Sequence, residues 1–353
     1  MSKAGFASAR EARRALATAV AQADEGRLVA RNGTTVAEWL DQWLERAALD
    51  LKPTTIAGYR RAALKINASF GRSRLQDLTP LLVEQLYLKM LRAGLSPKTV
   101  RHTHSFLRHA LQDAERLGLI VRNPAAVAKA PRVHRKEQQT WTPEQLSAFL
   151  NTTVAERYHA IFVLLATTGM RRGEVVGLRW SNLDLDRGVL SVIHTFTTVN
   201  GAMLESTVKT SKSRRQVSLD AVTVLVLRAH RAKQNAGRLA LGPAWVDHDL
   251  VFCEPDGSPL HPDKLTVRFR QLVRASTLPV IRLHDLRHTH ATLALRAGVH
   301  PKVVSERLGH ATTGITLDIY SHVAPELDHQ AAEKVAGLLD LDLPDGRTGD
   351  VGG

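Results

Sequence analysis

The chain of 353 residues has only one cysteine, Cys253, and aromatic side chains make up just 5% of it. A single cysteine excludes a disulfide within the chain, which fits a reducing cytosol. No apolar run approaches the roughly 20 residues that a membrane-spanning helix needs, and the polar, alanine-rich N-terminus lacks the pattern of a secretory signal. No repeat at a solenoid period is visible, and histidines are scattered rather than grouped as metal ligands. The sequence therefore predicts a cytoplasmic protein without a membrane partner.

Acidic side chains are also in short supply. Asp and Glu number 34 against 48 Lys and Arg, which gives a net charge of +14 and an isoelectric point near 10.3. Such an excess argues for a polyanionic partner, although a merely soluble basic protein remains the alternative. Hydrophobic residues make up 44% of the chain, enough for real cores. The length predicts two or three domains.

The most informative stretch runs from His284 to Tyr320. His284 and Arg287 are spaced i and i+3 in a helical pattern, so they share one face. The next helix is predicted to end at Gly309, a natural C-terminal cap, and His310 follows it directly. A guanidinium binds two phosphate oxygens at once and stays charged. A tyrosine can act as a covalent nucleophile, but its free pKa of about 10 requires help from neighbouring cations.

This pattern resembles the C-terminal half of the tyrosine recombinases, and its residues are most similar to those of the integrases of phages and conjugative transposons. The resemblance rests on His-x-x-Arg, Leu-Gly-His and a Tyr ten residues after that His. The family needs an upstream arginine, which Arg171 in Thr-Gly-Met-Arg-Arg-Gly-Glu matches. It also needs a lysine on a β-hairpin, which Lys209 in Val-Lys-Thr-Ser-Lys-Ser-Arg-Arg matches. Six matching positions occur in order: Arg171, Lys209, His284, Arg287, His310 and Tyr320.

The resemblance implies a role for each position. Tyr320 would attack the scissile phosphate and form a 3′-phosphotyrosine link, while Arg171 and Arg287 clamp the phosphate and stabilise the transition state. Lys209 would protonate the departing 5′-hydroxyl. These roles need no metal and no nucleotide cofactor, because arginines supply the positive charge and the phosphotyrosine link keeps the energy of the broken bond.

Two histidines complete the implied chemistry. His284 would assist proton transfer around the tyrosine, and His310 would donate a hydrogen bond to the phosphate. The carboxylates of Glu174 and Asp285 are expected to hold the neighbouring arginines in place rather than to react. Nearby basic and imidazole side chains are interpreted as packing residues, plain surface or non-specific phosphate contacts: Arg172, Lys212, Arg214, Arg215, His288, His290, His300 and His322.

The implied function is site-specific recombination of DNA. Four protomers would bind double-stranded attachment sites and exchange strands through a Holliday junction, to integrate or excise a phage or mobile element in a prokaryotic cytoplasm, near the nucleoid. An accessory directionality or DNA-bending protein is a further partner that the resemblance allows. Two alternatives stay open: relaxation of DNA by a type IB topoisomerase-like enzyme, and DNA binding by a regulator without catalysis. Covalent trapping on nicked DNA would separate the enzymes from the regulator.

The predicted fold is multidomain, with an all-α core-binding domain followed by a mixed α+β catalytic domain. An N-terminal helix in residues 1–30, about Ser8 to Glu25, is interpreted as the remnant or the end of an arm-binding region. Residues 31–130 form the helical DNA-binding domain, 131–140 a basic linker, and 141–343 the catalytic domain with a C-terminal helix. The polar, glycine-rich tail 344–353 is predicted to be disordered.

Within the helical domain, Thr35 and Glu38 predict a capping box, and further helices are expected from Pro53, Pro80 and Pro97. Trp39, Trp43 and Tyr59 have the spacing of core residues, as do Ile56, Ala63 and Leu64. Basic residues on one face of the fourth helix and in the linker are interpreted either as solvated charges or as phosphate contacts: Lys98, Arg101, Arg108, Arg132, Arg135 and Lys136.

In the catalytic domain, strands are expected at 189–194, 204–209 and 216–219, with a hairpin turn at Asn200-Gly201. Helices are expected from Pro143, Asp220 and Pro262. Cys253 is predicted to be a small buried residue. The apolar helix 326–341 is expected to pack either on its own domain or on a neighbouring subunit.

Overall fold

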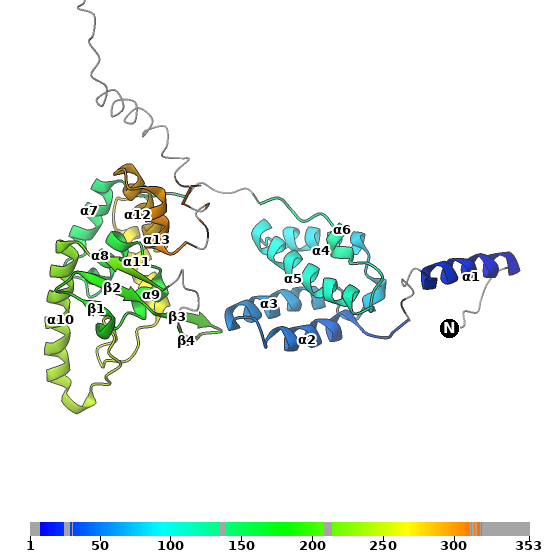
Figure 1. Ribbon diagram of the computed structural model, residues 1–353, viewed down its shortest axis with the longest axis horizontal. Coiled ribbons are helices and arrows are strands. Elements are labelled where there is room, and N and C mark those ends of the chain that lie inside the picture. Colours follow the sequence, from blue (N-terminus) through cyan, green and yellow to red (C-terminus); the bar gives the residue numbers. More distant parts are fainter. Residues whose placement is uncertain are drawn as a thin grey trace, which may run out of the picture. The chain divides into compact units, whose positions relative to one another are not determined.

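The computed structural model describes residues 8–24, 29, 31–133, 138–207, 214–310, 312, 314, 316, 317 and 319. The chain divides into two compact units, Met1–Lys136 and Glu137–Gly353, each with its own hydrophobic core. The first contains only helices among its described residues and is called the helical unit; the second adds strands and is called the mixed unit (Figure 1). None of the described helices is both long and apolar enough to cross a membrane.

The helical unit begins with α1, whose bounds Ala9–Asp24 agree with the predicted N-terminal helix. Thr35 and Glu38 form the expected capping box at the start of α2, and prolines occupy the first turn of α3, α4, α5 and α6, where no backbone donor is needed. The remaining elements of this unit are α2 Val36–Ala47, α3 Pro53–Phe70, η1 Leu75–Asp77, α4 Pro80–Arg92, α5 Pro97–Arg116 and α6 Pro124–Val127.

Aromatic side chains build the core of the helical unit. Trp39 is 1% exposed and its indole nitrogen donates to the carbonyl of Ala110 at 2.9 Å. Trp43 packs on Phe106 at a ring distance of 5.7 Å, and Tyr59 lies against the same cluster. Their predicted core role is therefore confirmed. The expectation for Leu64 was wrong, because it is 70% exposed: its neighbours in sequence already fill the face of α3 that meets α2 and α5.

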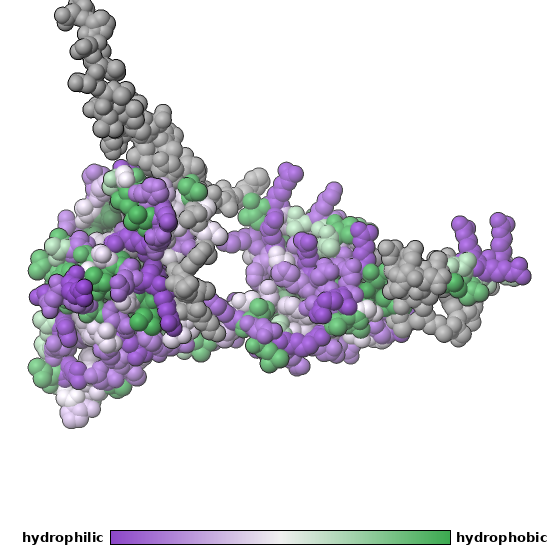
Figure 2. Space-filling view, viewed as in Figure 1, coloured by the Kyte–Doolittle hydropathy of each residue, from purple (hydrophilic) through white to green (hydrophobic). Residues whose placement is uncertain are grey.

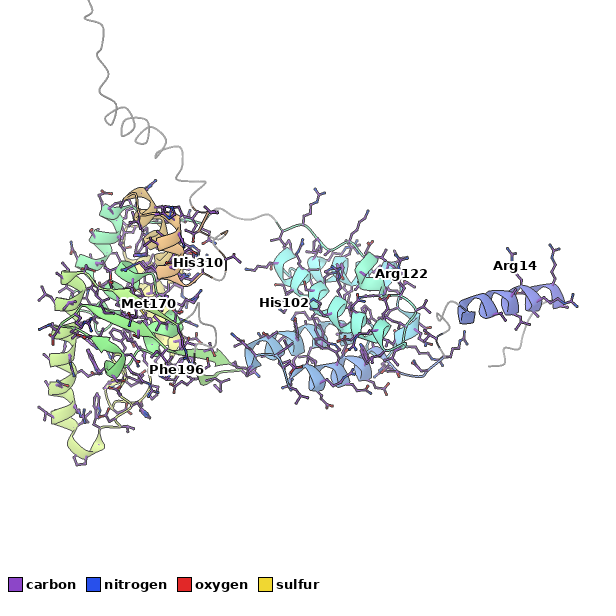
Figure 3. The ribbon with its side chains drawn as sticks, viewed as in Figure 1. Arg14, His102, Arg122, Met170, Phe196 and His310 are labelled. Carbon is purple, nitrogen blue, oxygen red and sulfur yellow. The ribbon has the colours of Figure 1, made fainter. Side chains whose placement is uncertain are left out.

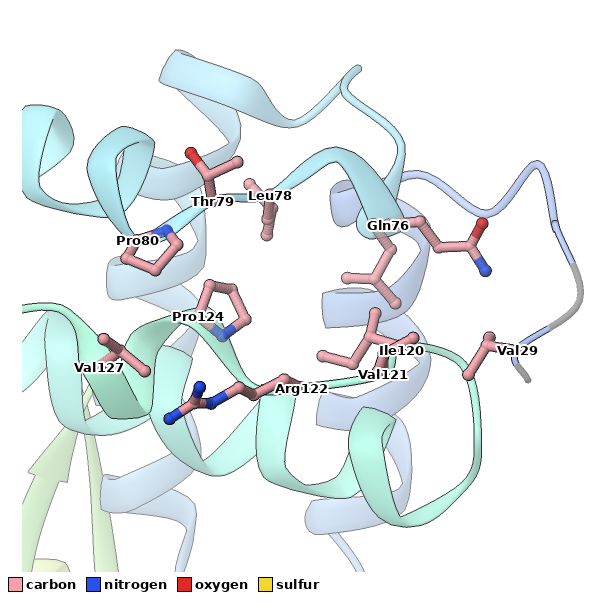
Figure 4. Close-up of a pocket in the computed structure, with 11 residues that line it drawn as sticks. Val29, Gln76, Leu78, Thr79, Pro80, Ile120, Val121, Arg122, Pro124 and Val127 are labelled. Atoms are coloured by element: carbon pink, nitrogen blue, oxygen red, sulfur yellow. The ribbon is translucent and has the colours of Figure 1, made fainter. Parts of the chain in front are cut away.

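A cavity of about 420 Å³ opens on the helical unit beside η1 and α6. Leu78, Pro80 and Pro124 line it together with other mostly apolar side chains, and among the described residues Arg122 is the one charged side chain of the lining (Figure 4). A single arginine among prolines and aliphatic groups does not make a site for phosphate chemistry. The candidate active site has to be sought in the mixed unit.

The mixed unit begins with helices, continues with short strands and ends with helices again. Its elements are α7 Pro143–Thr152, α8 His159–Thr168, α9 Arg172–Val176, η2 Trp180–Asn182, β1 Leu183–Asp184, β2 Val189–Val192, β3 His194–Val199, β4 Ala202–Thr207, β5 Arg215–Ser218, α10 Ala221–Leu241, η3 Gly242–Ala244, α11 Pro262–Ala275, α12 Asp285–Arg296 and α13 Pro301–Leu308. The helices predicted from Pro143, Asp220 and Pro262 are confirmed, with Asp220 as the N-cap of α10.

The strands form two small antiparallel sheets. One has the order β1-β2-β5, and the other is the β3–β4 hairpin, which projects from the body of the unit in Figure 1. Asn200 and Gly201 close the hairpin with φ angles of 50° and 83°, the positive values that a two-residue turn matching the strand twist requires. The predicted turn is confirmed. β5 pairs with β2 so that Arg215 lies opposite Val192.

The core of the mixed unit surrounds α8, which is buried along almost its whole length. Phe162 of this helix packs between Phe149 and Phe269 at ring distances of 5.5 and 5.7 Å. A helix that is apolar on all sides can only lie inside a core. The loop that leaves its C-terminal end is consequently held on a rigid support. In Figure 2 hydrophilic side chains cover much of the visible face of each unit, with smaller hydrophobic areas between them.

Candidate active site

Arg171 lies directly after the buried helix α8. The helix ends at Gly169, whose φ of 64° is left-handed, and an added Cβ there would come within 2.4 Å of Leu308 Cδ2. Only glycine fits this tight turn. Arg171 then caps α9, and its guanidinium donates to Glu174 Oε1 and to the carbonyl of Gly309, both at 2.8 Å. Its side chain keeps 40% exposure, so it can still meet a ligand.

Arg287 lies in the first turns of α12 and is only 4% exposed. Its Nη1 donates to the carbonyl of Gly169 at 2.8 Å, whereas its buried Nη2 has no hydrogen-bond partner among the described residues. Burial, followed by the nearby positive charge of Arg171, lowers the pKa of Arg287 from its ordinary value to about 9. A buried donor without an acceptor is costly, and an anionic ligand at this position would remove that cost.

The two arginines and His310 are joined through two glycine turns. Arg287 bonds to the turn that precedes Arg171, and Arg171 bonds to Gly309, the residue before His310. Gly309 ends α13 with a φ of 66°. His310 therefore lies at the C-terminal end of α13, where Figure 3 labels it. Segments far apart in the sequence thus bring three predicted site residues together.

The histidines of this region are held neutral. Burial, then the charges of Arg287 and Arg171, lowers the pKa of His310 to about 4, and its Nδ1 lies 2.7 Å from Thr316 Oγ1. The pKa of His284 is also lowered, by the protein packed around it and by His288 and Arg287, although its side chain stays accessible to solvent. His288 packs edge-on against His284, with ring centres 5.2 Å apart. Neutral imidazoles can accept a proton, as a general base must.

His290 and His300 have structural positions. His290 Nδ1 lies 3.0 Å from the carbonyl of Ala166; because a carbonyl only accepts, Nδ1 carries the proton. Burial then lowers the pKa of His290 to about 4. His300 caps α13 by accepting from the backbone nitrogen of Lys302. His322 lies outside the described residues.

Glu174 holds two arginines, and the second was missed from the sequence. Arg215 donates from Nη2 to Glu174 Oε2 at 2.8 Å and from Nε to the carbonyl of Arg307 at 2.7 Å. Both side chains of this pair are buried, with 6% and 4% exposure. The interpretation of Arg215 as surface or a non-specific contact was wrong. Alternation along β5 would have revealed it, because Arg215 shares a strand face with the buried Val217.

Burial alone would raise the pKa of Glu174, but hydrogen bonds and charge from Arg215, with the charge of Arg171, lower it overall. The carboxylate is consequently ionised and fixed beside Arg171, as expected. The expectation for Asp285 was wrong in its partner. Asp285 accepts from Arg282, at 2.6 Å from Nη2, because the chain entering α12 folds that arginine back over the helix start.

Lys209 and Tyr320 lie outside the described residues, as do Lys212 and the helix expected at 326–341. The structure describes positions that flank two of them. β4 ends at Thr207 and β5 begins at Arg215. Thr316 is fully buried, and Ile319 packs on the small core between α12 and α13. Lys209 and Tyr320 as catalytic residues therefore stay predictions.

The basic face of α5 is exposed, as both interpretations required. Lys98, Arg101 and Arg108 are all accessible to solvent, and in the described part of the chain none of them forms an ion pair. The buried side of the same helix carries Val100 and Leu107. Arg132 is exposed too, whereas Arg135 and Lys136 lie outside the described residues.

The remaining polar groups are easily assigned. Arg172 pairs with Asp263 at 2.8 Å, and Arg214 is exposed. Cys253 is half-buried rather than fully buried, and burial raises the pKa of its thiol while Gln234 donates to its sulfur at 3.0 Å. No three His, Cys, Asp or Glu side chains among the described residues are grouped to hold a metal ion.

Comparisons with known proteins agree with this architecture. The phage integrase family model matches residues 139–326, more than half of the chain, and the model of a phage integrase N-terminal SAM-like domain matches residues 35–91. A tyrosine recombinase XerC-like protein of Caldanaerobacter subterraneus is 27% identical over 86% of this chain and 83% of its own.

Two solved structures share the fold at low sequence identity. The integrase of the transposon Tn1549, in complex with transposon right-end DNA, has a TM-score of 0.74 and 20% identity, over 86% of this chain and 100% of that one. A lambda integrase tetramer bound to a Holliday junction has a TM-score of 0.62 and 17% identity, over 90% and 88%. The fold is thus that of the tyrosine recombinases, as predicted. The chain belongs to the phage integrase family and is a site-specific recombinase.

Proposed function

We propose that this recombinase cuts and rejoins double-stranded DNA through a 3′-phosphotyrosine intermediate, with Arg171 and Arg287 holding the scissile phosphate. The observation that carries the proposal is the buried, unpartnered Nη2 of Arg287 beside the half-exposed guanidinium of Arg171. A phosphate would supply the missing acceptor and offset the repulsion between two cations. Both arginines are fixed by backbone carbonyls, so little reorganisation is needed when charge develops.

The proton transfers fall to the other matched residues. Tyr320 attacks phosphorus, its phenolic proton passes to the neutral His284, and the bond between phosphorus and the 5′-oxygen breaks. Lys209 gives a proton to the departing 5′-oxygen, and His310 donates from Nε2 to a non-bridging oxygen. Burial keeps both imidazoles neutral at neutral pH, so His284 has a lone pair for the proton and His310 can donate one hydrogen bond. The negative charge of a bound phosphate would raise the pKa of His284 and so strengthen it as a base.

Each part of the chain has its own role in this proposal. Residues 31–130 bind the duplex through phosphate contacts on α5, 131–140 cross the DNA as a basic linker, and 141–343 carry the catalytic residues. Four subunits on two attachment sites would exchange strands through a Holliday junction, the kind of DNA to which the lambda integrase tetramer is bound. The reaction would move a phage or mobile element in a prokaryotic cytoplasm, with an accessory protein setting direction.

The test uses a nicked attachment-site duplex, which traps the covalent intermediate because the short cut strand diffuses away. Wild-type protein is expected to form a protein–DNA adduct, whereas Tyr320→Phe binds equally well and forms none, because only the phenol oxygen is lost. An adduct from Tyr320→Phe would remove that residue from the mechanism. Joined products from two sites distinguish recombination from relaxation of a single duplex.

A further inference from the structure

Arg215 touches three of the elements that position the proposed chemistry. Its Nη2 and Nη1 donate to Glu174 at 2.8 and 3.2 Å, and Glu174 in turn binds Arg171. Its Nε donates to the carbonyl of Arg307, three residues before His310. Its side chain also fills the space beside Gly309, where an added Cβ would lie 3.0 Å from Nη1. One guanidinium thus connects α9, α13 and β5.

The place of Arg215 at the start of β5 adds a further constraint. β5 begins at Arg215 and is held in register by β2, so this residue fixes the C-terminal end of the segment that carries Lys209. The ion pair with Glu174 is almost fully buried. A buried ion pair adds little net stability compared with apolar packing, yet it holds its partners in one geometry. Such a pair is better explained by a need for precision than by stability.

We propose that Arg215 is a positioning residue for DNA cleavage: it fixes Arg171 through Glu174 and, at the same time, the α13 terminus that carries His310. This inference rests on the proposed function, because it concerns the geometry of that same site. Arg215 itself has almost no accessible surface with which to bind DNA. Its loss should therefore leave DNA binding unchanged and slow the chemical step, since misplacement by about 1 Å can cost about 100-fold in rate.

The central variant is Arg215→Lys. It keeps the charge that neutralises Glu174, so the fold survives, but one ammonium cannot replace a fork that bonds to Glu174 and to Arg307 together. With a nicked duplex at saturating concentration, adduct formation per folded molecule is expected to fall at least about tenfold. The DNA concentration at half-saturation should stay within about twofold of wild type. Glu174→Gln, which keeps the shape but loses the charge, should slow the same step.

A double-variant cycle separates positioning from a general loss of stability. If Arg215 acts in part through Arg171, the double variant Arg171→Lys with Arg215→Lys should be less impaired than the product of the two single rate losses. Arg268→Lys is the matched control. Arg268 also binds a carboxylate, Glu156, through two nitrogens, but this pair reaches none of the proposed catalytic residues. The cleavage rate of Arg268→Lys should equal that of wild type.

Each outcome decides the matter. Wild-type cleavage by Arg215→Lys, or rate losses that multiply in the double variant, would overturn the positioning role while leaving the proposed function intact. A fall in DNA affinity with an unchanged rate would likewise overturn it. If wild-type protein binds the nicked duplex but forms no adduct, the proposed function fails and this inference fails with it.

Discussion

A buried arginine with an unfilled donor is the most telling single residue of this protein. Arg287 has lost its hydration, lies near a second cation and has one nitrogen without an acceptor among the described residues. All three features raise the free energy of the unliganded site. A bound phosphate would offset the burial, the repulsion and the missing hydrogen bond together. Release of this unfavourable free energy would then favour binding of the phosphate.

Removal of that guanidinium should affect chemistry more than binding. Arg287→Ala is expected to lower the rate of adduct formation by about 3–4 kcal/mol of transition-state stabilisation, roughly a factor of 100 to 1,000, by analogy with oxyanion-hole donors. DNA affinity, measured by titration, should change little, because the other cations proposed to contact phosphates remain in place. Arg274→Ala, on the exposed face of α11, is the control. A near-normal rate in Arg287→Ala would exclude this arginine from the site.

His290 should make the mixed unit sensitive to acid. Its pKa is about 4 in the folded chain against an ordinary 6.5, so between these values the unfolded chain binds more protons and stability falls as pH falls. Between pH 6.5 and pH 5.5, the contribution of His290 should lower the free energy of unfolding by about 1 kcal/mol. His290→Gln should flatten the pH dependence of the unfolding free energy in that window. Equal slopes for both proteins would contradict the assignment.

At the scale of the element, α5 divides its faces cleanly. Val100 and Leu107 are buried, while Lys98, Arg101 and Arg108 point to solvent without ion pairs in the described part of the chain. Exposed, unpaired cations along one helix face are suited to contact phosphates, and such contacts do not depend on the base sequence. The same geometry is also that of a solvated surface, so only binding data can choose between them.

The triple variant of these residues to alanine gives that choice. If all three contact phosphates, the slope of log affinity against log salt should decrease by about three units, with weaker binding to every sequence. Arg116→Ala is the control on the same helix, because Asp113 already neutralises that arginine at 3.0 Å. An unchanged salt slope in the triple variant would mean that the face is merely solvated.

At the scale of the whole molecule, the proposed mechanism needs subunits that act in turn. Four tyrosines cutting together would break both duplexes, so we predict that the position of each Tyr320 depends on a neighbour. The apolar helix expected at 326–341, which lies outside the described residues, follows Tyr320 closely and is suited to this coupling. Its apolar side must be buried somewhere, and a neighbouring subunit is the place that would control cutting.

Truncation after Val323 tests this coupling. The shortened protein should bind a single site normally, because the residues proposed to contact DNA lie before Val323. It should lose cooperative assembly and recombination. Gel-shift titration measures the first, and formation of joined products measures the second. Unfolding of the truncated protein would assign the helix to its own core, and normal recombination would deny it any role in assembly.

Sequence patterns predicted most elements because their signals are local. Capping residues, prolines in first turns, the Asn200-Gly201 turn and the helix end at Gly309 all act within a few residues, and the structure follows them. Predictions of individual partners were less reliable. Leu64 and the partner of Asp285 were misjudged because the outcome depends on which neighbouring surface a side chain meets, which no local pattern contains.

The sequence by itself determined the family, the order of the elements and the six matching positions, since spacing along a helix or turn is a one-dimensional property. Tertiary structure alone decided how Arg171, Arg287 and His310 meet across 139 positions of sequence, from 171 to 310. It also decided that Arg215 is buried rather than on the surface. The physical reason is that burial and charge pairing are set by contacts between distant segments, and these exist only once both glycine turns and the α8 core have formed.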